Sequence, residues 1–240
     1  MPVPDNAKEF KVGYDLTEFL EIKKWEPQIP VSLKGTMAGR FPSFVPKTDE
    51  ERIQNLKSDF FKWKGENRKF TVTEKIDGTS FTAFLKDGKF GVCSRNWELK
   101  ETEDNLYWKI ARTLNLEKLL LEQGLNLSIQ GEIAGPGVQG NKCKLEKIDL
   151  YVFNIWDIDN QTKFSQSGMR SFCQSLGLKT VPILHEDFQL PETIEEIISM
   201  ADGETIFSKS KREGLVFISD EPNRISFKVI SNKFLLKNGE

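Results

Sequence analysis

Alternation of hydrophobic and polar residues is the clearest pattern in the first half of the chain. Lys69–Glu74 follows this period-two pattern, which is typical of a half-buried strand, and Thr79–Lys86 and Lys89–Ser94 are interpreted as two further strands. The Asp87-Gly88 pair between the last two predicts a two-residue hairpin turn. Lys75 therefore lies at the end of a strand. It precedes Gly78, a residue that allows the backbone to approach a ligand closely.

The remaining pattern predicts both helices and strands. Predicted strands are Asn126–Ile133, Asp149–Ile158, Gly214–Ser219 and Arg224–Ile230, the last two forming a hairpin. Predicted helices are Thr48 to about Lys57 (with Thr48 and Glu51 as a capping box), Glu103–Gln123, Gln166–Leu176 and Pro191–Ala201, with proline at the first helical position. Because the strands outnumber the helices and cluster as hairpins, we expect an α+β protein with largely antiparallel sheets. Residues 1–34 are interpreted as an extension or linker remnant, and residues 35–240 as the folded domain.

Composition narrows the class of protein. The chain has 240 residues and a formal net charge of −2, which does not indicate a nucleic-acid binder and does not exclude one, because phosphate is held by local clusters. Two basic clusters are present, each interpreted as either solvated surface or a binding stripe: Lys142, Lys144 and Lys147, and Lys209, Lys211 and Arg212. Three widely spaced cysteines favour a reducing, intracellular compartment, cytoplasmic or nuclear. A single histidine, His185, argues against a histidine-rich zinc site, and no stretch is long and apolar enough for a membrane span.

Candidate chemistry begins with Lys75. An amine is a nucleophile only when neutral, so a lysine in this role needs burial or neighbouring cations that favour the neutral form. Arg95, in Ser94-Arg95-Asn96, carries a planar fork that suits phosphate or ribose oxygens. The alternatives are an ordinary surface lysine and an exposed arginine at a strand end.

Four further segments contain residues that suit nucleotide chemistry. Glu132 precedes a glycine-rich loop and suits ribose hydroxyls or a divalent metal. Phe153 lies in an apolar strand, where it either stacks on a base or belongs to the core. Glu213 suits metal coordination, and Lys228 with Lys233 suits triphosphate charge, the alternative being a structural salt bridge across the hairpin.

The joint order of these segments resembles the covalent nucleotidyltransferase superfamily of ATP-dependent DNA ligases, RNA ligases and mRNA-capping guanylyltransferases. The matching pieces are Glu74-Lys75-Ile76-Asp77-Gly78, Ser94-Arg95-Asn96, Gly131-Glu132, the strand around Phe153, Glu213-Gly214 and Lys228. Within this group the chain is most similar to RNA ligases, over the segments Gly39–Leu56, Gly131–Asn141 and Ser226–Lys237. The resemblance covers roughly residues 35–237.

This resemblance implies the fold, the cofactors and the reaction. It implies a nucleotidyltransferase (ATP-grasp-like) domain with two sheets flanked by helices and the nucleotide pocket between them. It further implies ATP and Mg²⁺ or Mn²⁺ as cofactors, and RNA with 5′-phosphate and 3′-hydroxyl ends as the partner, sealed through a lysyl-AMP on Lys75. The implied catalytic residues are Lys75, Lys228 and Lys233. The implied nucleotide-binding residues are Glu74, Lys75, Ile76, Asp77, Arg95, Glu132, Phe153, Glu213, Lys228 and Lys233, with Arg52 near the departing pyrophosphate and Glu213 and Glu132 at the metal.

Two features depart from the family pattern. The last motif is often Lys-x-Lys, but Ile230 stands where the second lysine would follow Lys228, so Lys233 is assigned that role. An OB-fold module also usually accompanies this domain, and residues 1–34 are too few to form one. We therefore expect an isolated, monomeric catalytic domain, cut from a longer protein or naturally minimal. The alternatives are a DNA ligase, a capping nucleotidyltransferase and a catalytically silent RNA-binding module.

Overall fold

The computed structural model describes residues 15–23 and 35–238 and divides the chain into two units, residues 1–35 and residues 36–240. In the first unit the described segment is a turn. One carboxylate oxygen of Asp15 accepts hydrogen bonds from the backbone N–H and the hydroxyl of Thr17. The Leu20 N–H donates to the Leu16 carbonyl at 2.9 Å. In neither described part is there a helix that combines the length and apolar character needed to span a membrane.

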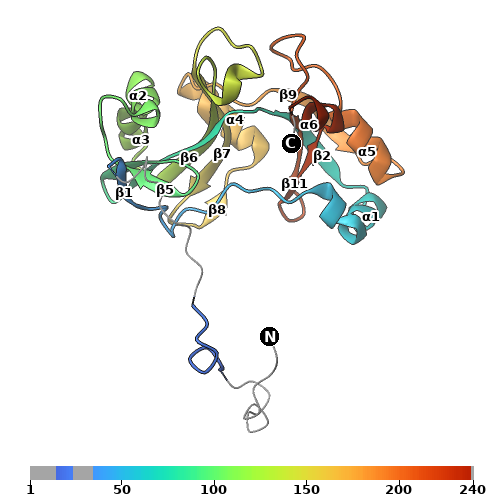
Figure 1. Cartoon of the computed structure of the whole chain (residues 1–240), viewed down its shortest axis with the longest axis horizontal. Coiled ribbons are helices and arrows are strands. Elements are labelled where there is room, and N and C mark those ends of the chain that lie inside the picture. The colour runs from blue at the N-terminus through green and yellow to red at the C-terminus, as the bar shows by residue number, and fades with distance from the viewer. Residues whose placement is uncertain (1–14, 24–34, 239–240) are drawn as a thin grey trace. The chain divides into compact units, whose positions relative to one another are not determined.

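The second unit consists of two antiparallel sheets with helices on their outer faces (Figure 1). In spatial order, the seven-stranded sheet contains β1 (Met37–Arg40), β5 (Trp97–Leu99), β4 (Lys89–Cys93), β3 (Thr79–Lys86), β6 (Leu127–Ala134), β7 (Asp149–Asp157) and β8 (Thr162–Lys163). The four-stranded sheet contains β11 (Ile225–Ile230), β10 (Gly214–Ser219), β2 (Lys69–Lys75) and β9 (Ile183–Gln189). The expected α+β class with two antiparallel sheets is confirmed.

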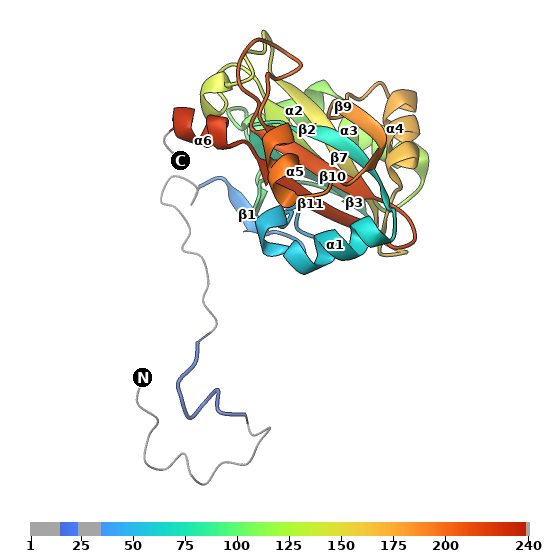
Figure 2. The ribbon, with the colours of Figure 1, turned by 90° about the vertical axis from the view of Figure 1, so that its right-hand side faces the viewer.

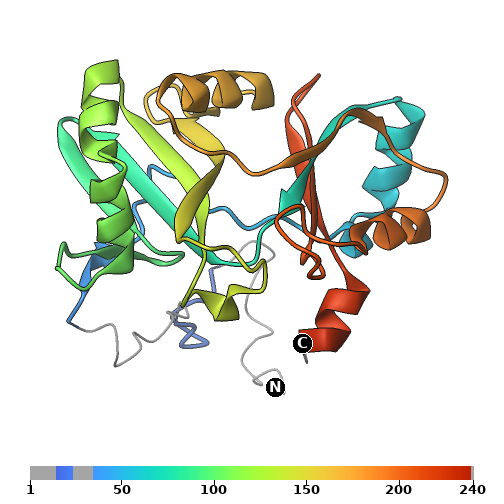
Figure 3. The same ribbon diagram turned by 90° about the horizontal axis from the view of Figure 1, so that it is seen from above.

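Helices cover the two sheets on opposite sides. Helices α1 (Lys57–Gly65) and α5 (Ile194–Ala201) lie over the four-stranded sheet, as Figure 2 shows. Helices α2 (Leu106–Thr113) and α3 (Leu116–Gln123) lie over the seven-stranded sheet (Figure 3). The remaining helical elements are α4 (Gln166–Ser175), α6 (Asn232–Asn238) and the short 3₁₀ turns Ile53–Asn55 and Gln139–Asn141.

Stacked aromatic side chains form the core beneath the four-stranded sheet. Phe217 of β10 and Phe227 of β11 stack with ring centroids 4.9 Å apart, and Trp63 of α1 stacks on Phe227 at 5.6 Å. Phe60 and Phe70 are also fully buried in this cluster. Burial of each such side chain contributes about 1.5–3 kcal/mol relative to exposure. This core therefore holds strand β2, and with it the backbone of its last residue, in a fixed position.

The chain passes from one sheet to the other immediately after Lys75. Lys75 is the last residue of β2 in the four-stranded sheet, and Thr79 is the first residue of β3 in the seven-stranded sheet. The three residues between them are therefore the connection between the two sheets. The following hairpin is as predicted, because Asp87 (φ 50°) and Gly88 (φ 76°) have the positive φ values of a two-residue type I′ turn.

The predicted helix at Thr48 is wrong. Arg52 forms a parallel bridge with Lys228 of β11, and the Lys228 N–H donates to the Glu51 carbonyl at 2.8 Å. The segment before Ile53 is thus extended beside a sheet edge, and α1 begins only at Lys57. The Glu51 carboxylate accepts from Arg52 and Asn55, so it does not complete a capping box. A long-range backbone pairing has overridden a local helix signal.

Two other predicted helices differ in their bounds. The stretch 103–123 is divided at Asn115, whose left-handed φ of 52° ends one helix and begins the next. Helix α5 starts at Ile194 rather than Pro191, because the Thr193 hydroxyl caps it by accepting from the Glu196 N–H at 3.2 Å. The strands predicted after residue 125 agree with β6, β7, β10 and β11 to within one residue at each end. His185 lies exposed on β9, away from the pocket described below.

Candidate active site

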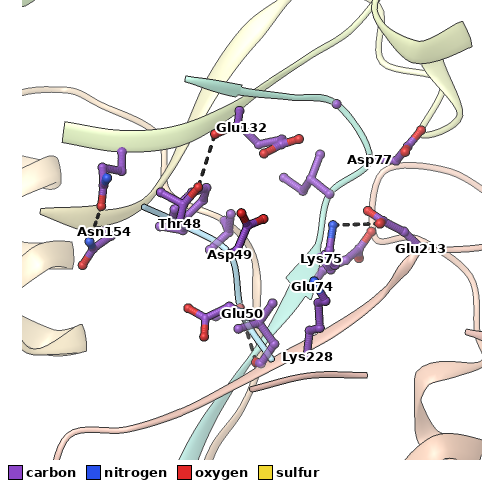
Figure 4. A pocket seen from close by; sticks show the side chains of 18 of the residues that line it. Thr48, Asp49, Glu50, Glu74, Lys75, Asp77, Glu132, Asn154, Glu213 and Lys228 are labelled. Atoms are coloured by element: carbon purple, nitrogen blue, oxygen red, sulfur yellow. Dashed lines mark hydrogen bonds and ion pairs between the residues drawn. The ribbon is translucent and has the colours of Figure 1, made fainter. Parts of the chain in front are cut away.

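A pocket of about 450 Å³ lies between the two sheets of the second unit (Figure 4). The nucleotide-binding residues predicted from the sequence that line it are Arg52, Glu74, Lys75, Ile76, Asp77, Arg95, Glu132, Phe153, Glu213 and Lys228. These residues come from both sheets and from the segment that precedes α1. Segments far apart in the sequence therefore converge on one cavity.

Lys75 and Glu213 point toward one another in this pocket (Figure 4). The Lys75 Nζ atom lies 2.7 Å from Glu213 Oε1, and the two side chains are 27% and 15% exposed. Glu213 immediately precedes Gly214, which pairs with Lys75 across β10 and β2. A Cβ atom at Gly214 would lie 2.1 Å from the Val229 carbonyl oxygen, so glycine is required for the close packing that brings the ion pair together.

Glu132 brings a second carboxylate to the same end of the pocket. It lies on β6 opposite Ser80 of β3 and accepts a hydrogen bond from the Gly78 backbone N–H. Burial raises the pKa of Glu132 to about 7; the positive charge of Lys75 opposes this shift, and the carboxylates of Glu213 and Asp77 add to it. Glu132 is thus present in both protonated and ionised forms near neutral pH.

Asp77 completes a group of three carboxylates around Lys75. It lies in the connection between the sheets, and Lys142 approaches its Oδ2 atom at 3.6 Å. Carboxylate oxygens are the ligands that Mg²⁺ and Mn²⁺ prefer, so the donor set fits a divalent cation. Within the described residues, no three acidic, cysteine or histidine side chains are close enough together to hold an ion directly. The arrangement therefore suits an ion that keeps part of its water shell.

Lys228 contributes a second amine to the pocket. It is opposite Val216 in the β10–β11 hairpin and beside Arg52 in the bridge described above. Partial burial lowers the pKa of Lys228, and repulsion from the charge of Lys75 adds to this effect. Arg95 lies at the pocket rim, where its Nη2 atom is 2.6 Å from Asp49 Oδ1, with both side chains more than half exposed.

A β-bulge determines the position of Phe153. On β6, Gln130 pairs with Asn154 and the next residue, Gly131, pairs with Val152, so Phe153 is the extra residue of β7. A bulge of this kind redirects side chains beside active sites. Both Phe153 and its neighbour Asn154 line the pocket, which a regular strand would not allow. Tyr151 and Ile155, two positions before and after Phe153 in β7, are buried in the core.

Two of the predicted site residues, Lys233 and Glu74, have side chains that bind other protein groups. Lys233 is not among the residues that line the pocket, and its Nζ lies 3.4 Å from Asp202 Oδ2. Ile230 lines the pocket instead. Glu74 is 1% exposed, and its carboxylate accepts hydrogen bonds from the Thr205 hydroxyl and from the Ile206 N–H at 2.9 Å. Burial raises the pKa of Glu74, and these hydrogen bonds oppose the shift.

Several residues that line the pocket were not predicted from the sequence, namely Thr48, Asp49, Glu50, Gln130, Asn154, Lys163 and Arg224. Asn154 Nδ2 donates to Gln130 Oε1 at 2.5 Å, and Gln130 Nε2 donates to the Pro46 carbonyl at 2.8 Å. The side-chain amides of Gln130 and Asn154, each in an apolar strand, were a sequence signal for a polar contact between these strands, since a buried amide needs a hydrogen-bond partner. The only sequence signal for Asp49 was its position in Gly39–Leu56, one of the segments similar to RNA ligases.

Comparison with known proteins identifies the family. A sequence model described as RNA ligase matches residues 68–230. A search of curated proteins found no match. Among solved structures, Naegleria gruberi RNA ligase with PPi is 43% identical, with a TM-score of 0.81, over 98% of this chain and 70% of that one.

Two mutant forms of the same Naegleria gruberi enzyme are similarly close. The match to a mutant with ATP and Mn has 43% identity and a TM-score of 0.81, and covers 96% of this chain and 68% of that chain. The match to a mutant with AMP and Mn has 44% identity and a TM-score of 0.80, over 95% and 68% respectively. These matches favour an RNA ligase over the DNA-ligase and capping alternatives. The chain belongs to the RNA ligase family.

Proposed function

We propose that this chain is an ATP-dependent RNA ligase domain that carries AMP on Lys75 and joins RNA 3′-hydroxyl to 5′-phosphate ends. The observation that carries the proposal is the 2.7 Å pair of Lys75 and Glu213 inside a pocket that also contains Asp77 and Glu132. An amine beside three carboxylates serves a phosphoryl-transfer reaction that needs both a nucleophile and a divalent cation. The related ligase structures with ATP and Mn, and with AMP and Mn, support this assignment.

In the first step the neutral Lys75 amine attacks the α-phosphorus of ATP. A nitrogen–phosphorus bond forms, the bond to the bridging oxygen breaks, pyrophosphate leaves, and the nitrogen releases one proton to solvent. Lys228 would neutralise charge on the phosphate; partial burial and repulsion from the charge of Lys75 lower its own pKa. Glu213, Glu132 and Asp77 would hold the divalent cation, which neutralises phosphate charge when bound.

The rest of the pocket suits the nucleoside and the phosphates. We assign Phe153 to the adenine face, Arg95 and Glu132 to the ribose, and Lys228 to the α-phosphate. Arg52 is assigned to the pyrophosphate, because it is an exposed arginine at the pocket rim beside Lys228. Lys233 is left out of this set because Asp202 holds it.

The AMP then passes to RNA in two further transfers. An oxygen of the RNA 5′-phosphate attacks the AMP phosphorus, the nitrogen–phosphorus bond breaks, and Lys75 is released. The RNA 3′-hydroxyl next attacks the 5′-phosphate, a phosphodiester forms and AMP leaves. We assign these steps to residues 35–240 acting as a monomer inside the cell. The compartment rests on three free, buried cysteines, and size-exclusion chromatography of the purified chain tests the monomer.

Intact-mass spectrometry after incubation with ATP and Mn²⁺ tests the function directly. The parent chain should gain the mass of one AMP, and Lys75→Ala should gain none. Lys69→Ala is the matched control, since Lys69 lies exposed at the far end of the same strand and should be labelled like the parent. Covalently bound AMP on the Lys75→Ala chain would remove Lys75 from the role. A parent chain that takes up no AMP with Mg²⁺ or with Mn²⁺ would favour the silent RNA-binding module.

A further inference from the structure

Three segments that are far apart in sequence form one lysine-rich surface beside the pocket. They are residues 135–148, between β6 and β7, residues 202–212, between α5 and β10, and residues 232–238, in α6. Figure 3 shows them on the same side of the unit. We call residues 135–148, 202–212 and 232–238 the lysine surface.

Specific contacts hold the three segments together. Cys143 and Leu145 pack with Phe207, and the Cys143 side chain is hydrogen-bonded to Thr205. The Ser231 hydroxyl, at the start of α6, donates to Asp202 Oδ1 at 2.7 Å. Further contacts between the segments are Lys142 Nζ over the Phe234 ring at 4.8 Å and the ion pair of Lys233 with Asp202. The lysine surface is therefore a packed part of the fold.

The charge of this surface is opposite to that of the whole chain. It contains eight lysines and arginines and three acidic residues, whereas the formal net charge of the chain is −2. Arg212 is turned inward and donates to the carbonyls of Met200 and Ala201 at the end of α5. The other seven basic residues are lysines, and Lys144, Lys147, Lys209 and Lys237 are exposed. Charge is thus concentrated where an anionic partner can reach it.

The lysine surface begins at the reactive end of the pocket. Lys142 lies 3.6 Å from Asp77, Gln139 lines the pocket, and residues 202–212 lead directly into Glu213, the partner of Lys75. Exposed apolar side chains are interspersed among the lysines, one on each segment: Ile148, Ile206 and Leu236. Lysines with interspersed apolar side chains match the phosphates and the sugar and base faces of a polynucleotide strand.

We propose that the lysine surface binds the phosphate backbone of the RNA strand whose end reacts in the pocket, without reading its sequence. This inference rests on the proposed function, because that function requires an RNA 5′-phosphate to reach the AMP on Lys75. Lysine ammonium groups act as point charges on phosphates and do not specify bases. An acidic protein domain is the competing occupant, and the experiment separates the two.

Fluorescence anisotropy with a 5′-phosphorylated single-stranded RNA and a nicked RNA duplex, in the absence of ATP, tests the surface. Lys144→Glu/Lys209→Glu should bind at least tenfold more weakly than the parent. Its slope of log affinity against log salt should fall by about 2, near one unit for each lost phosphate contact. Lys57→Glu/Lys62→Glu changes the net charge equally, on exposed residues of α1, and should bind within twofold of the parent. Both variants should take up AMP at the parental rate.

Equal weakening of both variants would overturn the inference, because net charge alone would then explain binding. Absence of RNA binding by the parent at 50 mM salt would also overturn it and favour the protein partner. The outcome is separable from that of the proposed function. A chain that binds RNA through the lysine surface but takes up no AMP contradicts only the proposed function. A chain that takes up AMP but binds RNA equally well without Lys144 and Lys209 contradicts only this inference.

Discussion

Replacement of Gly78 by alanine should displace Glu132 and slow the transfer of AMP to Lys75. A Cβ atom at Gly78 would lie 2.3 Å from the Ile133 carbonyl oxygen and 2.9 Å from Glu132 Cγ. Ordinary contacts of this kind begin near 3.4 Å, so the connection between the sheets and β6 must separate by about 1 Å. The variant would also disturb the hydrogen bond from the Gly78 N–H to Glu132. Glycine is needed here for space, not for an unusual backbone angle.

A displacement of about 1 Å near reacting groups can reduce a rate about 100-fold, which corresponds to about 2.7 kcal/mol in activation free energy. Single-turnover labelling, followed by intact mass at saturating ATP and Mn²⁺, measures this rate. Crowding of this kind also costs about 1–3 kcal/mol of folding free energy, so the melting temperature of each variant must be recorded.

Two matched glycine variants separate local displacement from loss of stability. A Cβ atom at Gly91 would lie 2.2 Å from the Phe84 ring, in the core of the seven-stranded sheet and away from the pocket. Gly91→Ala should therefore lower the melting temperature and leave the labelling rate of the folded fraction unchanged. A Cβ atom at Gly65, in α1, would have no heavy atom within 4 Å, so Gly65→Ala should leave the labelling rate unchanged and should not lower the melting temperature. A folded Gly78→Ala variant that is labelled within threefold of the parental rate would refute the steric argument.

Two further predictions concern pH and the nucleobase. Because burial raises the pKa of Glu132 to about 7, folded Glu132 keeps a proton that the unfolded chain releases above about pH 4.5. The parent should therefore lose stability relative to Glu132→Gln as pH rises from 5 to 8, by at most about 3 kcal/mol. A difference in melting temperature between the two proteins that stays constant across this pH range would contradict the shift. Phe153→Ala should weaken ATP binding about tenfold or more, because the stacking of a base on an aromatic ring is worth about 1–3 kcal/mol. Phe164→Ala is the control and should not weaken ATP binding, because Phe164 packs against Phe172 of α4 and does not line the pocket. Isothermal titration of a Lys75→Ala background measures the affinity without turnover, and unchanged affinity in the Phe153 variant would place the base elsewhere.

Local pattern was sufficient for much of this protein. The alternation in Lys69–Glu74 predicted the bounds of β2 closely, because a strand with one buried face needs a period of two. The apolar stretches Asn126–Ile133, Asp149–Ile158, Gly214–Ser219 and Arg224–Ile230 predicted β6, β7, β10 and β11 to within one residue at each end. The Asp87-Gly88 pair predicted a type I′ turn because both positions require positive φ. The order of the lysine, arginine and glutamate segments indicated the family and ten of the residues that line the pocket.

Long-range contacts decided the rest. Thr48 and Glu51 have helix-capping spacing, but the backbone at 51–52 pairs with Lys228, more than 170 residues away, and is extended. A capping interaction is worth about 1 kcal/mol, so pairing with a sheet edge can outweigh it. No local signal distinguishes these outcomes.

The pocket itself depends on tertiary structure in the same way. The sequence by itself placed Phe153 in a strand and Lys233 after one, but it did not contain the bulge or the ion pair that orient them. The bulge requires the register of β7 against β6, and Asp202 reaches Lys233 from a loop thirty-one residues earlier. The direction of a side chain depends on which strand or loop packs against it, and that is determined only when the two sheets and their loops come together.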